Sequence, residues 1–239
     1  MGRKSAKIAA KKGAADKAKS QIYTKALHDV ATAVKSGGGD PETNFLLKIA
    51  LDRCKKFNVP KDNIERAIAR GMGSGGEGYE DVNYEGYGPN GVAVFVETST
   101  NNVTRTVANV RSYFNKSGGS LGKDGCLQFI FDRKAVFTVP KELVTDEEEL
   151  QLELIDAGAE DFDSDEEFFE IYGPMDAFGT IQNKLQELNI TPEEASLQRI
   201  PTTFKAIDDE TMALMEKLIG SLEDDEDVVS VYHNIEGEE

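Results

Sequence analysis

The sequence has few of the residues that build metal sites or crosslinks, with two cysteines and two histidines in 239 residues. Cys54 and Cys126 cannot form a disulfide framework, and together with His28 and His233 they lack the spacing of a zinc site. No stretch approaches the roughly 20 consecutive apolar residues that a transmembrane helix requires. We therefore expect no metal, no disulfide scaffold and no membrane contact.

Signatures of enzymes are missing as well. The chain has no G-x-S-x-G, no H-E-x-x-H and no Walker lysine. Gly71, Gly73 and Gly76 formally fit a dinucleotide fingerprint, but a helical pattern precedes them and an acidic, Tyr-rich loop is expected after them, so residues 71–78 are interpreted as a flexible linker. Cys54 has basic neighbours, yet its place on an apolar helix face favours a buried thiol. We expect a non-enzymatic protein without a cofactor or small-molecule substrate.

Charge of opposite sign is concentrated at the two ends of the chain. The net charge is −17, but residues 1–80 carry 16 basic against 9 acidic side chains, and residues 81–134 carry 6 against 5. Residues 135–239 carry only 5 basic against 30 acidic side chains. A polyanion is attracted to the first part and repelled by the last, so the average charge does not exclude nucleic-acid binding.

The basic part of the chain predicts a mobile arm followed by a helical domain. Residues 1–20 are mainly Lys, Ala and Gly, and they have too little apolar surface to fold alone. Residues 21–75 show apolar side chains at helical spacing and predict three helices. These begin near Ile22, at Asp40 as an N-cap with proline at the first helical position, and near Pro60.

Strands and helices alternate after the linker. Residues 79–134 predict a short strand, a helix over 102–117 and a strand over 126–131. Residues 135–203 read β-α-β-β-α-β, which is the ferredoxin-like order. A final helix and strand in residues 204–239 complete the second domain. The predicted fold is therefore α+β and multidomain, with an N-terminal helical domain and two α/β sandwich-type domains, the acidic ferredoxin-like third inserted in the second.

The candidate nucleic-acid contacts are basic and polar side chains of the first 134 residues. Cationic arms commonly follow phosphates, and the helix over 102–117 carries a polar, cationic face opposite its apolar stripe. A solubilising tail and an ordinary exposed helix face are the alternative explanations. The candidates are Arg3, Lys4, Lys7, Lys11, Lys12, Lys17, Lys19, Tyr23, Lys25, Arg105, Asn109, Ser112, Lys116, Lys123, Arg133 and Lys134.

Several segments together resemble one known family. They are GRK, SGGGDPETN, VPKDNIERAI, YEGYGPNGVAVFVE, GGSLGKDGCLQFIFDRK, ASLQRIP and DVVSVYHNIE. In order and spacing they resemble the YebC/PmpR family, which is described as probable transcriptional regulators. The resemblance implies three domains, with the third inserted in the second. It also implies DNA binding, although a mitochondrial relative is a translational activator of a cytochrome oxidase subunit and bacterial members are linked to stalled ribosomes.

We therefore expect a cytosolic, nucleic-acid-binding regulator of gene expression, with DNA-binding control of transcription as the first interpretation. Two alternatives stay open. In the first alternative, the protein is a ribosome-associated translation factor that binds RNA. In the second, it is an interaction module whose acidic surface binds a basic protein and which does not bind nucleic acid. No helix shows obvious base-contacting residues, so the sequence does not separate DNA from RNA.

Overall fold

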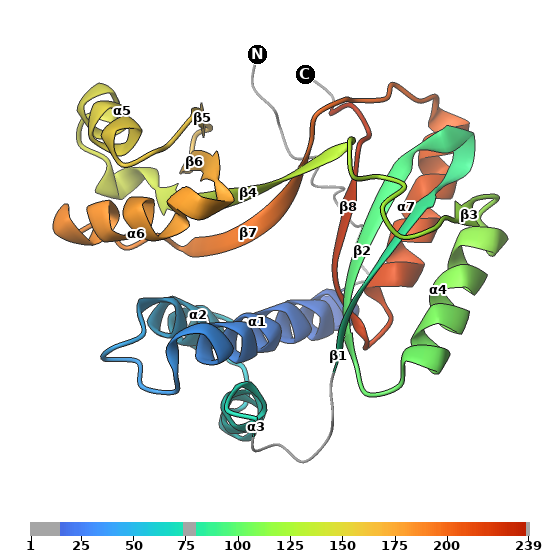
Figure 1. The fold of residues 1–239 in the computed structure, drawn as a ribbon, viewed down its shortest axis with the longest axis horizontal. Coiled ribbons are helices and arrows are strands. Elements are labelled where there is room, and N and C mark those ends of the chain that lie inside the picture. Colours follow the sequence, from blue (N-terminus) through green and yellow to red (C-terminus); the bar gives the residue numbers. More distant parts are fainter. Residues whose placement is uncertain (1–14, 74–79, 238–239) are drawn as a thin grey trace.

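The computed structural model describes residues 15–73 and 80–237, which form three helices followed by two antiparallel four-stranded sheets (Figure 1). The chain is α+β. No helix within these ranges combines the length and apolar character that a membrane span requires.

The N-terminal helices pack around a shared apolar core. They are α1 (Ala15–Gly37), α2 (Phe45–Lys56) and α3 (Lys61–Gly71). Val30 and Val34 of α1 are buried against Leu47 and Cys54 of α2. Helix α1 begins at Ala15 and so reaches into the segment expected to be a mobile arm, because Ala and Lys are strong helix formers.

The start of α2 differs from the prediction of a cap at Asp40. The N-cap is Asn44, which is buried, and its side-chain oxygen accepts from the Leu47 amide at 3.1 Å. The Asn44 amide nitrogen donates to the carbonyl oxygens of Ala33 and Gly38, both at 2.8 Å. Asn44 thereby caps α2 and also satisfies carbonyls at the end of α1, which the exposed Asp40 does not do.

Sheet A has the strand order β3-β1-β2-β8. Its strands are β1 (Glu80–Tyr87), β2 (Ala93–Thr100), β3 (Ser120–Leu121) and β8 (Val228–His233). The helices α4 (Val103–Lys116) and α7 (Asp209–Glu223) lie together on one side of it (Figure 1). Val94 and Val96 pack there against Phe114 and Met215. A short 3-10 helix, η1 (Pro89–Gly91), joins β1 to β2.

The loop expected after the glycine run is in fact strand β1. Val82 and Tyr84 alternate along it and belong to the core of sheet A. Gly86 continues this alternation, because a Cβ there would lie 2.7 Å from the ring of Phe114. Because Gly86 has no apolar side chain, only Val82 and Tyr84 show the period of two that marks a strand, which is too short a run to identify one.

Sheet B has the strand order β5-β6-β4-β7, and every pairing in it is antiparallel. Its elements follow in the order β-α-β-β-α-β that the sequence predicts, and α5 and α6 contribute to one core with the sheet. The elements are β4 (Phe131–Pro140), η2 (Lys141–Leu143), α5 (Glu147–Asp156), β5 (Asp161–Ser164), β6 (Phe168–Pro174), η3 (Met175–Ala177), α6 (Phe178–Glu187) and β7 (Glu194–Pro201).

The strand predicted over 126–131 is wrong. Residues 124–130 form turns, and β4 begins only at Phe131. Leu127 and Phe131 are both buried against Ala93 and Phe95, on the side of sheet A opposite α4 and α7. The side chain of Phe129, which lies between them in the sequence, is exposed. The segment therefore forms turns although most of its residues are apolar.

Candidate nucleic-acid interface

The predicted arm lies largely outside the described residues. This applies to Arg3, Lys4, Lys7, Lys11 and Lys12, and to the side chains of Lys17 and Lys19, whose backbone is part of α1. The structure therefore gives no geometry for these candidate contacts.

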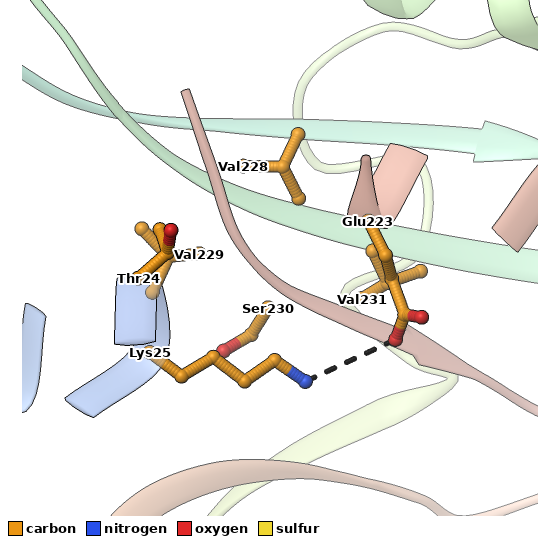
Figure 2. A pocket seen from close by; sticks show the side chains of 7 residues that line it. All are labelled: Thr24, Lys25, Glu223, Val228, Val229, Ser230 and Val231. Atoms are coloured by element: carbon orange, nitrogen blue, oxygen red, sulfur yellow. Dashed lines mark ion pairs between the residues drawn. The ribbon is translucent and has the colours of Figure 1, made fainter. Parts of the chain in front are cut away.

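Tyr23 and Lys25, the two candidates on the described part of α1, contact other parts of the protein. The Tyr23 hydroxyl donates to the carbonyl oxygen of Asn58 at 3.0 Å. The Lys25 Nζ lies 3.9 Å from a carboxylate oxygen of Glu223 at the end of α7, beside the start of β8 (Figure 2). Lys25 thus links the helical part to sheet A.

Most other cations of the helices also have acidic partners. Arg53 lies 2.9 Å from Asp29 and 3.2 Å from Glu194 of β7. Four lysines form further pairs, namely Lys35 with Asp81, Lys55 with Asp52, Lys56 with Glu193 and Lys61 with Glu65. Exposed pairs of this kind add little stability, but they offset charge that a phosphate would otherwise meet.

Two of the four candidate side chains on α4 are hydrogen-bonded to carboxylates of this chain. Arg105 donates to both carboxylate oxygens of Asp227, at 2.7 and 2.8 Å, and Asn109 donates to Asp225 at 3.0 Å. Burial alone raises the pKa of Asp227, but hydrogen bonds from Arg105 and Thr106 outweigh it and lower that pKa below its usual value. Arg105 therefore fastens α4 to the turn before β8.

The remaining candidates separate into two groups. Ser112 is partly buried, and Lys134 pairs with Glu160. Lys116, Lys123 and Arg133 are exposed and form no ion pair with a described residue. These three lie at the end of α4, in the loop after β3 and near the start of β4.

Arg111 was missed by the sequence reasoning and belongs with them. It is exposed on α4, and among the described residues it has no ion-pair partner. Its position lies between the apolar and polar stripes that the periodicity identifies, so neither stripe includes it. We call Arg111, Lys116, Lys123 and Arg133 the unpaired cations. Lys48, Arg66 and Lys217 are also exposed and have no ion-pair partner among the described residues, but they lie on three separate helices. The unpaired cations, by contrast, all fall within residues 111–133.

The loop of residues 122–130, which carries Lys123, is held by a buried carboxylate. Glu85 of β1 is 7% exposed, and it accepts from the amides of Leu127 at 2.6 Å and Gly125 at 3.0 Å. The Gly122 amide donates to the Glu85 carbonyl oxygen at 2.8 Å. The loop is thereby hydrogen-bonded to β1 through both the side chain and the main chain of Glu85.

A cleft of about 570 Å³ separates α1 and α2 from β7 and β8. Arg53, Asp29 and Glu194 line it, so its charges largely offset one another. Burial raises the pKa of Asp29 although Arg53 opposes it, and burial lowers the pKa of His28 to about 4. Across the described ranges, no three His, Cys, Asp or Glu side chains are arranged to hold a metal ion. We therefore place the candidate interface at the unpaired cations, of which Arg133 also lines this cleft.

The buried thiol that the sequence predicts for Cys54 is confirmed. Cys54 is buried in the helical core, and burial raises the pKa of its thiol to about 11. A thiol in that state is not a nucleophile near neutral pH.

Two family models match the chain in succession. Residues 3–74 match the TACO1/YebC protein N-terminal domain, and residues 79–235 match the TACO1/YebC second and third domain. A protein of Wolinella succinogenes is 48% identical over 217 residues, which cover 90% of this chain and 92% of that protein. One from Bacteroides fragilis is 47% identical over 225 residues, or 92% of each chain. Both are named probable transcriptional regulatory proteins.

A solved structure agrees with these matches. The crystal structure of a conserved hypothetical protein from Aquifex aeolicus is 38% identical, with a TM-score of 0.80 over 98% of this chain and 97% of that one. The resemblance found in the sequence segments is confirmed. This chain belongs to the TACO1/YebC family.

Proposed function

We propose that this protein is a non-enzymatic, nucleic-acid-binding regulator of gene expression in the cytoplasm, with DNA as its first candidate ligand. The names of its relatives support a regulatory role. The observation that carries the proposal is the set of unpaired cations, Arg111, Lys116, Lys123 and Arg133, which run from α4 through the loop to β4.

Unpaired cations are the side chains best suited to phosphates. Each phosphate that a lysine or arginine neutralises releases condensed counterions, which drives binding. A lysine already paired with a carboxylate must first give up that partner, so its net contribution is smaller. The lysines of the N-terminal arm extend the proposed contact through their charge alone.

The strand pairings also support the predicted domain arrangement. Strand β8 pairs with β2, with Val231 opposite Val96, so the chain returns to sheet A after completing sheet B. We infer that residues 135–203 form a ferredoxin-like domain inserted in the second domain. Because residues 135–239 carry 30 acidic side chains, this part of the chain repels a polyanion that contacts the unpaired cations.

A pair of charge-matched triple variants tests the proposal. Arg111, Lys116 and Lys123 are changed to Gln in the full chain, and the control changes Lys35, Lys55 and Lys61, which are exposed but paired. Fluorescence anisotropy with labelled duplex DNA and with RNA measures affinity across salt concentrations. We expect the first variant to lose affinity and its slope of log K against log salt on duplex DNA to shrink by about 2.7. The control should stay close to the wild type.

Two results would decide against the proposal or redirect it. Equal behaviour of both triple variants would show that the unpaired cations make no special contact. A clear preference for RNA by the wild type would favour the translational alternative over control of transcription. Circular dichroism melting checks that the exposed substitutions leave the fold intact.

A further inference from the structure

Phe129, near the end of the loop of residues 122–130, is 84% exposed. Leu127 and Phe131 on either side of it are 0% and 4% exposed, so the turn buries its neighbours and directs Phe129 outward. A phenylalanine left in water forgoes about 1.5–3 kcal/mol that burial would contribute to folding. Its exposure is therefore not explained by the core of this chain.

The support beneath Phe129 is rigid. Besides the two amides held by Glu85, the Tyr87 hydroxyl donates to the Cys126 carbonyl oxygen at 3.4 Å. The Thr202 hydroxyl donates to the Phe129 carbonyl oxygen at 3.2 Å. Burying a carboxylate costs free energy unless it accepts hydrogen bonds, and the buried Glu85 carboxylate accepts them from amides of the loop. Movement of the loop would break these hydrogen bonds. Phe129 is thus presented in a fixed position, which lowers the entropy lost on binding.

We propose that this loop is a contact site for unpaired bases of a nucleic acid, with Phe129 as the side chain on which a base stacks. Exposed aromatic rings combined with cations that follow the backbone are how proteins bind single strands. Lys123 and Arg133, both unpaired and exposed, flank Phe129 along the chain and supply the phosphate contacts. The bases must be unpaired, because both faces of a base inside a duplex are already stacked.

Charge distinguishes this surface from the exposed apolar side chains of α5. Leu152 and Ile155 on α5 are 67% and 52% exposed, but they lie among the carboxylates of an acidic helix. A nucleic acid is repelled there. Residues 81–134, in contrast, carry a slight excess of basic residues, 6 against 5. This inference rests on the proposed function and specifies the form of nucleic acid that is bound.

The absence of tryptophan from the chain makes the test direct. Phe129→Trp introduces the only indole, which a stacked base quenches, and Leu152→Trp places one on α5 as the control. We expect a single-stranded oligonucleotide to quench the first variant and leave the second unchanged. Phe129→Ala should weaken single-strand binding about 5- to 150-fold, since base stacking is worth roughly 1–3 kcal/mol per base. Leu152→Ala should bind like the wild type.

The outcomes separate this inference from the proposed function. If Phe129→Ala binds single strands like the wild type, or if the Trp variant binds without quenching, stacking is refuted. Loss of binding in the Arg111, Lys116 and Lys123 variant would then still support nucleic-acid binding. If the wild-type chain binds neither single strands nor duplex, both proposals fail. Because Phe129 is exposed, its variants should melt at the wild-type temperature, which confirms that the fold is unchanged.

Discussion

Replacing Glu85 with glutamine tests how the loop of residues 122–130 is held in place. The carboxylate accepts from two amides, those of Leu127 at 2.6 Å and Gly125 at 3.0 Å. Glutamine retains one acceptor oxygen but turns its NH₂ group towards the second donor. One hydrogen bond is then lost, the other is no longer charge-assisted, and a buried N–H loses its partner. Bonds to charged groups contribute about 1.5–3 kcal/mol, so we expect a local cost of about 2 kcal/mol.

Hydrogen exchange measured by mass spectrometry detects this change. A local cost of about 2 kcal/mol should speed exchange in the loop about 30-fold, because each 1.4 kcal/mol is a factor of ten. The control is Glu142→Gln, which removes the same charge from an exposed residue of η2. Unchanged protection of the loop in Glu85→Gln would refute the account of its rigidity.

Two further predictions come from contacts of described residues, and a third comes from the charge of the N-terminal arm. Because the folded-state pKa of Asp227 is lowered, its ionised form stabilises the protein above the unfolded pKa of about 3.9, and that contribution fades as pH falls through the lower folded value. Asp227→Asn should therefore lower the melting temperature at pH 7 and have little effect in strong acid. Gly86→Ala should destabilise by about 1–3 kcal/mol through its clash with Phe114, whereas Gly220→Ala in α7, with nothing within 4 Å, should melt no lower than the wild type. Changing the arm lysines to Ala should reduce the salt slope on duplex DNA by about 5 with little change in melting temperature, which salt titration and melting curves check; the lysines are Lys4, Lys7, Lys11, Lys12, Lys17 and Lys19.

Local patterns predicted most of the elements. The apolar spacing of Val103, Val107, Val110 and Phe114 identified α4, and the element order of residues 135–203 was read from alternating periods. Both patterns depend on which side of one element is buried, which is a property of neighbouring residues. Both patterns can therefore be recognised in the sequence without knowledge of the tertiary structure.

The errors arose where distant residues decide the local structure. The segment 126–131 turns because Glu85, some 40 residues earlier, accepts hydrogen bonds from the amides of Leu127 and of Gly125 just before the segment. Arg105 sits on a polar helix face, but Asp227 lies 122 residues further along the chain. Spacing contains no information about such partners, so neither the paired state of Arg105 nor the exposure of Phe129 could be predicted.

Ultraviolet crosslinking in cells, followed by mapping of the crosslinked peptides, shows whether the protein contacts nucleic acid and through which residues. We expect nucleic acid to be recovered with the protein and crosslinked peptides to come from residues 111–133, including the one that contains Phe129. Sequencing of the recovered nucleic acid identifies it as DNA or RNA. Crosslinks confined to residues 135–203, or no nucleic acid above that of an uncrosslinked sample, would show that the unpaired cations and Phe129 do not bind nucleic acid.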